Sequence, residues 1–149
     1  MQLTRFTDLG LRVLLYLTHK ERDTFVTIAE IAEQFEVPHN HLIKVVNRLG
    51  KLGWIVATRG RNGGLNLVCD PRRLSLSTII QGLEGTTQLI DCASPPCALK
   101  SGCQLKSALD IGLRAFYASL EKVYLADMVK TPTGEKIVKL HRDYQLRYH

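Results

Sequence analysis

The chain has 149 residues, 45% of them hydrophobic and 23% charged, and its formal net charge is +6. A chain of this length can bury one core, or one compact domain plus an extension, which excludes a very large enzyme scaffold. No stretch approaches the roughly 18 to 20 apolar residues of a membrane span, and no long apolar run follows the amino terminus. We therefore expect a cytoplasmic protein that does not span a membrane.

The first third of the chain carries the signals of three helices, which we predict over residues 4–18, 28–34 and 38–52. Thr27 and Glu30 form the pattern of a capping box, in which hydroxyl and carboxylate each satisfy a backbone amide. Pro38 ends the second helix and fits the first turn of the third, and Gly53 is expected to cap the third helix. These signals predict a first helix, then a short helix and a longer one on either side of a tight turn.

After Gly53 the hydrophobic period changes from 3.6 to 2, which predicts strands over residues 54–58 and 65–69. A glycine-rich tip that carries Arg59 and Arg61 joins them. The order helix, helix, turn, helix, hairpin is that of a winged helix-turn-helix. The predicted fold class is therefore mainly α, with a small β-hairpin wing and a long dimerisation helix.

The second half is predicted to hold a brief helix over residues 78–83, capped by Ser75 or Ser77, then a loop and a longer helix. Apolar or small residues recur at helical spacing from Leu105 to Val123, a stripe that the small winged domain cannot cover alone. A second copy of the helix is the simplest cover, which predicts a homodimer, and folding back on the same chain is the alternative. The expected segments are a winged domain at 1–73, a short helix and cysteine loop at 74–104, a dimerisation helix at 105–130 and a flexible tail at 131–149.

Positive charge is concentrated between Pro38 and Arg73, where seven basic residues face one acid, while the rest of the chain is balanced. A local basic surface is the expected footprint of a protein that binds a polyanion, and here double-stranded DNA with a palindromic operator. At the start of the predicted recognition helix, side chains can reach base edges in the major groove, and arginines at the hairpin tip can enter the minor groove. The candidate DNA-binding residues are His39, Asn40, His41, Lys44, Arg59, Arg61 and Asn62, although either histidine could instead be a solvated polar residue.

Three of the four cysteines, Cys92, Cys97 and Cys103, lie within one loop. An odd number of thiols cannot pair off as structural disulfides, whereas three thiolates can converge on a metal or an iron-sulfur cluster. The spacing differs from the paired knuckles of structural zinc sites, and a cluster would need a fourth ligand from elsewhere. Asp91, Asp8 and Cys69 are the candidates in this chain, and Cys69 closes a strand, where a buried inert thiol is expected.

Several motifs together resemble the iron-sulfur winged-helix repressors that include the IscR and NsrR types. They are Met1 to Thr4, the Thr7-Asp8-x-Gly10-Leu-Arg12 segment, the Arg59-Gly-x-Asn-Gly-Gly64 hairpin, the cysteine loop, and Leu125 to Val129. Within this family the chain is similar to the NsrR type, the nitric-oxide-sensing repressors. The IscR type has a longer first cysteine gap and a histidine three residues after the last cysteine, where this chain has Lys106.

The resemblance implies a transcriptional repressor, not an enzyme, that releases DNA when nitric oxide nitrosylates its iron-sulfur cluster. It implies a 4Fe–4S cluster held by the three loop cysteines and by Asp8 of the opposite subunit, with Arg12 orienting that carboxylate. From the residues alone, Asp8 and Arg12 would be read as an ordinary i,i+4 surface pair. The alternatives are the same fold sensing iron-sulfur status or redox stress, through a 2Fe–2S cluster or a thiol switch, and an iron-sulfur electron-transfer protein.

Overall fold

A computed structural model describes residues 2–19, 25–85 and 88–149, so that Met1 of the amino-terminal motif lies outside the described residues. In chain order the elements are α1 (Arg5–Thr18), α2 (Ile28–Gln34), α3 (His39–Lys51), β1 (Ile55–Thr58), β2 (Gly64–Leu67), α4 (Leu76–Glu84), α5 (Gln104–Leu120), α6 (Leu125–Met128) and α7 (Thr133–Tyr148). The mainly helical fold with a two-stranded hairpin confirms the predicted fold class. Among the described residues, no helix is both long and apolar enough to cross a bilayer.

Helix α1 forms the centre of the core, packing against α3, α4, α6 and β2. Its Val13, Leu14 and Tyr16 are fully buried, and Leu42 and Leu49 of α3 meet them from the recognition side. Removing one such aliphatic side chain down to alanine would cost about 2 to 5 kcal/mol. The helices of the winged domain are thus held by one shared core. We call the part of the molecule built around this core the head (residues 4–85 with α6 and α7).

The caps that start and end the head helices follow the sequence signals. Thr27 accepts a hydrogen bond from the Glu30 amide at 3.1 Å, and Ser75 accepts one from the Thr78 amide at 3.1 Å. The Glu30 carboxylate does not complete the predicted capping box, because it is buried among other helices and bonds to Tyr16. Gly85 takes the left-handed conformation that ends α4, with φ 68°.

The hairpin is antiparallel, with Ile55 opposite Leu67 and Thr58 opposite Gly64. Its tip requires glycine, since a Cβ at Gly63 would collide with the Thr58 carbonyl oxygen. A single bridge from Val26 to Leu65 fastens the hairpin to the segment before α2, with the Leu65 amide donating to the Val26 carbonyl at 2.7 Å. The wing is therefore anchored at its base and exposed at its tip.

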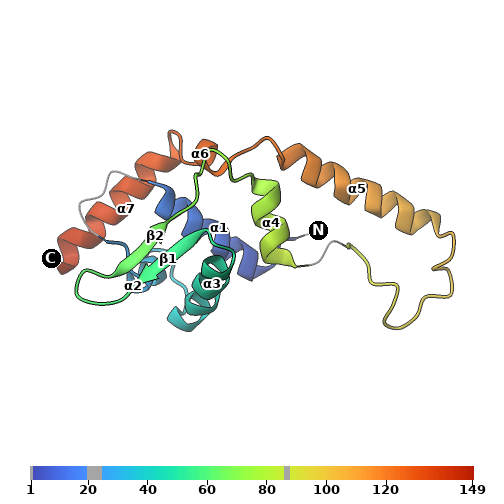
Figure 1. Cartoon of the computed structure of the whole chain (residues 1–149), viewed down its shortest axis with the longest axis horizontal. Helices are drawn as coiled ribbons and strands as arrows, with labels where there is room; N and C mark the ends of the chain where they lie inside the picture. Colours follow the sequence, from blue (N-terminus) through green and yellow to red (C-terminus); the bar gives the residue numbers. More distant parts are fainter. Residues whose placement is uncertain (1, 20–24, 86–87) are drawn as a thin grey trace.

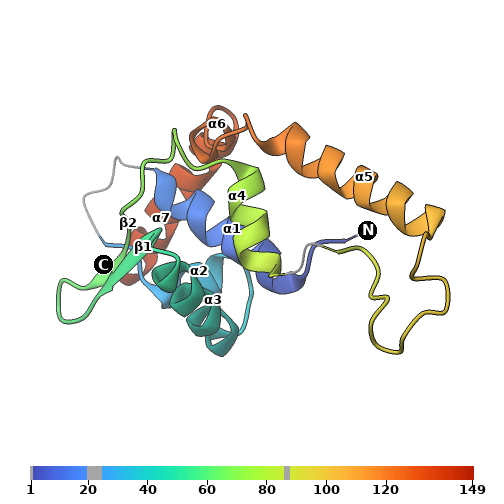
Figure 2. The same ribbon diagram turned by 45° about the vertical axis from the view of Figure 1, so that its right-hand side comes forward.

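Beyond α4 the chain leaves the head as an arm, made of the cysteine loop and α5 (residues 88–120). Both views show α5 and the loop projecting away from the other helices (Figures 1 and 2). Only Leu113 is buried among the 17 residues of α5, while Leu105 and Ile111 are 65% and 59% exposed. The arm therefore has little contact with its own head.

The predicted single helix over residues 105–130 is wrong, because the chain turns after Leu120 and starts α6 at Leu125. Tyr124 and Asp127 bond across the start of α6, the Asp127 carboxylate accepting from the Tyr124 amide at 3.1 Å. The Leu125 side chain is fully buried and its amide donates to the Leu74 carbonyl at 2.9 Å. Helix α6 therefore belongs to the head, and the arm ends at the turn before it.

The expectation of a flexible tail after residue 131 is also wrong, because residues 133–148 form helix α7. The helix lies beside α2, and its Ile137 and His141 are buried against the rest of the head. Polar contacts also hold it, such as the hydrogen bond that Tyr148 donates to Glu33 at 2.8 Å. A search for apolar periodicity passes over such a helix, since its buried face includes histidine and tyrosine.

Candidate DNA-binding surface and cysteine loop

The start of α3 presents the predicted base-reading side chains to solvent. His39, Asn40, His41 and Lys44 are all exposed, while Leu42 between them is 1% exposed and fixes the helix on the core. The helix begins after Pro38, whose extended backbone turns the chain into the first helical residue. The structure thus leaves these four side chains, on two successive turns, accessible to a groove of DNA.

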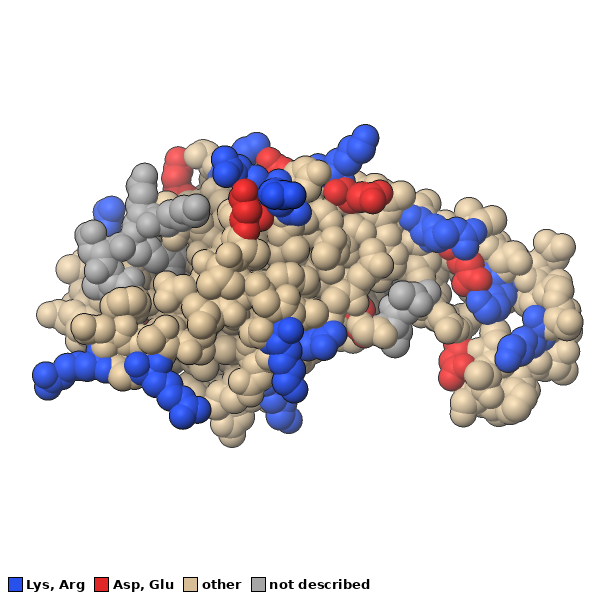
Figure 3. Space-filling model, in the orientation of Figure 1, with Lys and Arg blue, Asp and Glu red and all other residues tan. Residues whose placement is uncertain are grey.

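The hairpin tip supplies a second cationic element on the same side of the head. Arg59, Arg61 and Asn62 are exposed, and the space-filling view shows Lys and Arg side chains along the lower edge, below α3 and the hairpin (Figure 3). In the part of the chain that the structure describes, Lys44, Arg59 and Arg61 make no ion pair. Their charge is therefore available to phosphate groups.

Two other cations of the basic segment are already engaged within the head. Arg48 donates two hydrogen bonds to the Gly82 carbonyl of α4, at 2.8 and 3.2 Å, and so joins α3 to α4. Arg72 pairs with Asp70 at 3.2 Å, and this hydrogen bond raises the pKa of the Arg72 guanidinium. The Arg48 guanidinium is therefore committed to joining α3 and α4, and the charge of Arg72 is balanced by Asp70.

The cysteine loop places its three thiols in different environments. Cys92 is 8% exposed, Cys97 is exposed and Cys103 is half-buried, and all three are free thiols. The Cys97 amide donates to the Cys92 carbonyl at 3.2 Å, which draws the first half of the loop into a turn. Cys103 caps α5, its Sγ accepting from the Lys106 amide at 3.5 Å. The loop therefore ends on a helix that fixes its last cysteine.

Lys106 is a charged neighbour of two of these thiols. Its amine donates to Asp110 at 2.6 Å, one turn along α5. That hydrogen bond raises the pKa of Lys106, and the nearby Cys92 and Cys103 add to the rise. Bound thiolates carry negative charge, which this cation can balance. Sequence reasoning noted Lys106 only as a departure from the IscR pattern, although its position in the first turn after Cys103 already placed it beside the loop.

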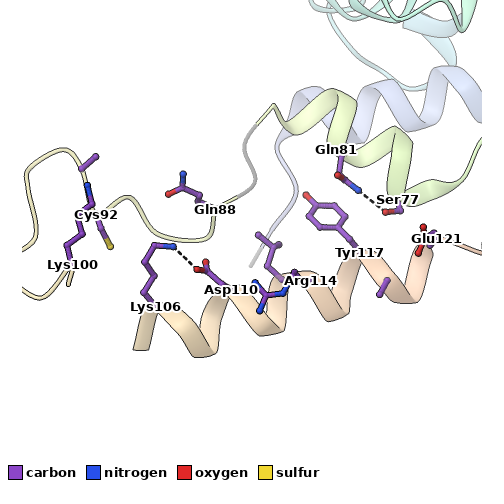
Figure 4. A pocket seen from close by; sticks show the side chains of 13 residues that line it. Ser77, Gln81, Gln88, Cys92, Lys100, Lys106, Asp110, Arg114, Tyr117 and Glu121 are labelled. Carbon is purple, nitrogen blue, oxygen red and sulfur yellow. Dashed lines mark hydrogen bonds and ion pairs between the residues drawn. The ribbon is translucent and has the colours of Figure 1, made fainter. Parts of the chain in front are cut away.

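The Cys92 and Lys106 side chains line a cavity of about 720 Å³ between α4, α5 and the loop (Figure 4). Its other walls include Gln81 from α4 and Arg114 and Tyr117 from α5. Burial raises the pKa of Tyr117, and the carboxylate of Glu84 adds to the effect. The cavity is thus lined by polar side chains and lies at the junction of head and arm.

Asp8 and Arg12 lie on the exposed side of α1. Arg12 Nε donates to Asp8 Oδ1 at 3.0 Å, and the two side chains are 45% and 44% exposed. The Arg12 guanidinium also stacks over the Phe35 ring, 5.6 Å from its centroid. Asp8 is therefore accessible from outside the chain, and its partner Arg12 is held by a second contact.

Within the described residues, no group of three or more His, Cys, Asp or Glu side chains is arranged to hold a metal ion. A single chain therefore brings together neither the three cysteines nor Asp8 as a ligand set. The donor chemistry nevertheless fits an iron-sulfur cluster, because three free thiols share one loop and two of them neighbour Lys106. Convergence of the three thiols requires the loop to tighten around the group.

The other candidates for a fourth ligand are already occupied in structural roles. Asp91 accepts a hydrogen bond from the Ala93 amide at 2.7 Å, which holds the turn before the loop. Cys69 is half-buried and packs against the core, and burial raises the pKa of its thiol. A raised pKa lowers the share of reactive thiolate at Cys69.

Comparison with known proteins places the chain in a family. It matches Rrf2, described as an iron-dependent transcriptional regulator, over residues 3–131. It is 40% identical over 142 residues to the HTH-type transcriptional repressor NsrR of Streptomyces coelicolor, a match that covers 94% of this chain and 96% of that protein. The resemblance drawn from the sequence motifs is thereby confirmed.

Solved structures show the same fold. CymR of B. subtilis, described as a global cysteine regulator, has a TM-score of 0.70 at 22% identity, covering 86% of this chain and 95% of that chain. IscR of T. potens has a TM-score of 0.69 at 23% identity, covering 87% of each chain. The family match spans most of the chain, so the protein belongs to the Rrf2 family of transcriptional regulators and is a homologue of the NsrR repressor.

Proposed function

We propose that the protein is a cytoplasmic, homodimeric repressor whose affinity for DNA is controlled by a 4Fe–4S cluster that senses nitric oxide. The observation that carries the proposal is the free three-cysteine loop on an arm joined to a complete winged helix-turn-helix. The 40% identity to a repressor named NsrR favours nitric oxide as the signal. Cys92, Cys97 and Cys103 are the proposed ligands, with Asp8 of the partner subunit as the fourth.

The exposure of Asp8 supports a role in the partner's site. When bound, the cluster supplies an iron atom with which nitric oxide can react. A carboxylate is a hard and weak ligand beside three thiolates, so the iron that it holds is the easiest to reach. Arg12 lies within hydrogen-bonding distance of Asp8 and orients the carboxylate, or pairs with it once it is released. The link ties the loop of one chain to α1 of the other.

The uncovered arm supports a dimer. On α5 the exposed apolar residue Leu105 shares a face with Gly112 and Phe116, which leaves apolar surface that its own head does not cover. A second copy related by twofold symmetry covers it with the same surface. Two recognition helices then meet a palindromic operator in successive major grooves, about 34 Å apart.

The first test measures iron, sulfide and zinc per chain after purification without oxygen, while visible absorption is followed through a nitric oxide titration. We expect about four irons and four sulfides per chain, as a 4Fe–4S cluster requires, and bleaching by a few equivalents of nitric oxide. Zinc, or protein without metal and with three titratable thiols, would overturn the cluster.

The second test separates a ligand from a surface ion pair. Asp8→Ala removes the carboxylate and Arg12→Ala removes only its partner. As an exposed pair the two residues contribute about 0.3 kcal/mol, so Asp8→Ala should not move the thermal midpoint measurably. Arg12→Ala should lower it slightly, since it also loses the contact with Phe35. If Asp8 ligates iron, Asp8→Ala alone should abolish the effect of nitric oxide on DNA binding. If nitric oxide changes DNA binding equally in the two variants, the Asp8 carboxylate acts only through its pairing with Arg12 and is not a ligand.

A second candidate function is a thiol switch, favoured by one observation: Cys97 is exposed on a loop that holds two further free thiols. Oxidation to a disulfide would then change DNA binding without iron. Mass spectrometry of the oxidised chain, with thiols blocked before digestion, would identify the linked pair.

A further inference from the structure

Helix α7, the last helix of the chain, is joined to α2 by a row of polar contacts. His141 Nδ1 lies 2.5 Å from Glu30 Oε1. Seven residues further along α7, Tyr148 donates a hydrogen bond to Glu33 at 2.8 Å, and Arg147 pairs with the same carboxylate at 2.9 Å. The contacts reach two residues of the short helix α2, Glu30 and Glu33, which lie one turn apart.

Glu30 is the centre of this arrangement, because its side chain joins three helices. Its carboxylate is fully buried, and Oε1 receives the Tyr16 hydroxyl from α1 at 2.6 Å as well as His141 from α7. The second oxygen, Oε2, has no hydrogen-bond partner in the part of the chain that the structure describes. A buried carboxylate is costly unless donors surround it, so the loss of either donor leaves a poorly compensated group.

Helix α2 is short and packs against both α7 and the recognition helix α3. It has seven residues, too few to be stable alone, and only Glu30 and Ile31 are buried. It is the first helix of the helix-turn-helix and packs against the recognition helix α3. A shift in the position of α2 would therefore also move the residues at the start of α3.

We propose that α7 is a positioning element for DNA recognition, which sets α2 and the start of α3 through the His141, Glu30 and Tyr16 contact. His141 and Tyr148 are positioning residues and touch no DNA themselves. The inference rests on DNA binding by the winged helix, and it does not require the iron-sulfur cluster.

The test uses the purified full-length dimer and two DNA probes. One is a duplex selected by the wild-type protein from a random pool, and the other is a shuffled duplex of the same length and composition. His141→Ala removes the contact to Glu30, and His141→Asn keeps a side-chain donor near the position of Nδ1. Leu146→Ala is the control, because Leu146 lies on the same helix, is uncharged and is 78% exposed.

We expect His141→Ala to weaken binding to the selected duplex about tenfold and to change binding to the shuffled duplex much less, because the shuffled duplex is held mainly through phosphates, which the hairpin-tip arginines can still reach. Amide hydrogen exchange across residues 28–34 should be faster in that variant. His141→Asn should recover most of the affinity, and Leu146→Ala should behave as wild type. A parallel loss on both probes would mean only that less protein is folded, and it would overturn the proposal, as would unchanged affinity.

A milder variant keeps the proposal testable if His141→Ala fails to fold. Tyr148→Phe removes one hydroxyl at the end of α7, while Arg147 still pairs with Glu33. We expect a loss of about twofold on the selected duplex alone, since one exposed hydrogen bond is a small contribution. Unchanged affinity for the selected duplex in a folded Tyr148→Phe dimer would contradict the proposal.

Discussion

Two helices of similar length show how differently the head and the arm are built. Helix α3 buries four of its 13 residues and is fixed to α4 by Arg48. Helix α5 buries one of 17 and leaves Leu105 and Ile111 in solvent. Both helices are amphipathic, but only α3 finds its apolar partner within the same chain. The DNA-reading half of the molecule is therefore complete in one subunit, whereas the proposed sensing half is not.

The largest effect should come from a substitution in the arm that removes bound iron without changing the stability of the head. Cys97 is exposed and makes no core contact, so Cys97→Ser should leave the thermal midpoint of the apoprotein unchanged. Loss of one of three thiolate ligands should remove nearly all bound iron, because serine is a poor cluster ligand. Iron and sulfide analysis beside a thermal melt measures both. Cys69→Ser is the matched control, and it should retain the iron.

The reverse experiment changes the head without affecting the arm. Arg59→Ala with Arg61→Ala removes two cations per subunit from the hairpin tip, where neither is paired within the described residues. We expect DNA affinity to fall at least about 100-fold at physiological salt, and the log-log salt slope to flatten by about three to four units for the dimer. Iron content should not change. A salt slope equal to that of wild type would show that the tip does not contact phosphates.

A substitution at Gly112 tests whether a second chain covers the arm. A Cβ at this position meets no atom within 4 Å in the single chain, so alanine or leucine should stabilise a monomeric helix by about 0.5 to 1 kcal/mol. If another α5 packs there, the larger side chain must separate the two helices. We expect Gly112→Leu to weaken the dimer roughly tenfold by analytical ultracentrifugation. A more stable protein with unchanged association would place the dimer contact elsewhere.

The smallest predicted effect lies at the joint of head and arm, where Glu84 accepts from the Thr4 amide at 2.8 Å and the Thr4 hydroxyl at 3.1 Å. Burial raises the pKa of Glu84, but hydrogen bonds from Thr7 and Thr4 outweigh it and lower the pKa below the ordinary value of 4.5. A lowered folded pKa stabilises the fold above about pH 4.5, and that contribution is lost as pH falls through the folded pKa.

Glu84→Gln should therefore cost about 0.5 kcal/mol in the free energy of unfolding at pH 7 and less below pH 4. Denaturant melts at both pH values measure the difference. A cost that grows on acidification would mean that the carboxylate is not stabilised by the threonines.

Much of the head could be predicted because its signals are local. Thr27 and Ser75 begin helices in the sequence and in the structure, and Gly53 follows the end of α3 with a positive φ. The change of period after Gly53 gives the hairpin to within two residues. Helix α7 was not predicted from the sequence, because its buried face combines the apolar Ile137 with the polar His141. Counting aromatic and histidine side chains would have revealed it, as positions 137, 140, 141, 144 and 148 share one face.

The site could be predicted less completely, and for a physical reason. The thiols could be proposed as ligands from their number and spacing, but the single chain does not bring the three together among the residues that the structure describes. The cavity beside Lys106 arises from the packing of α4 on α5, which no local pattern encodes. The placement of Asp8 in the partner's site stays a prediction.

The hydrogen bonds from Arg48 to the Gly82 carbonyl limit how a change in the arm can affect the recognition helix. Trp54, at the base of the wing, also packs so closely on Gly82 that a Cβ there would lie 2.8 Å from the indole ring. Recognition helix, wing and α4 thus meet at Gly82, and we expect them to move together. In the proposed dimer, a signal in the arm would then alter DNA binding by changing the distance between the two heads. That distance is counted in base pairs, so operators whose half-sites are one base pair closer or further apart should respond to the signal differently.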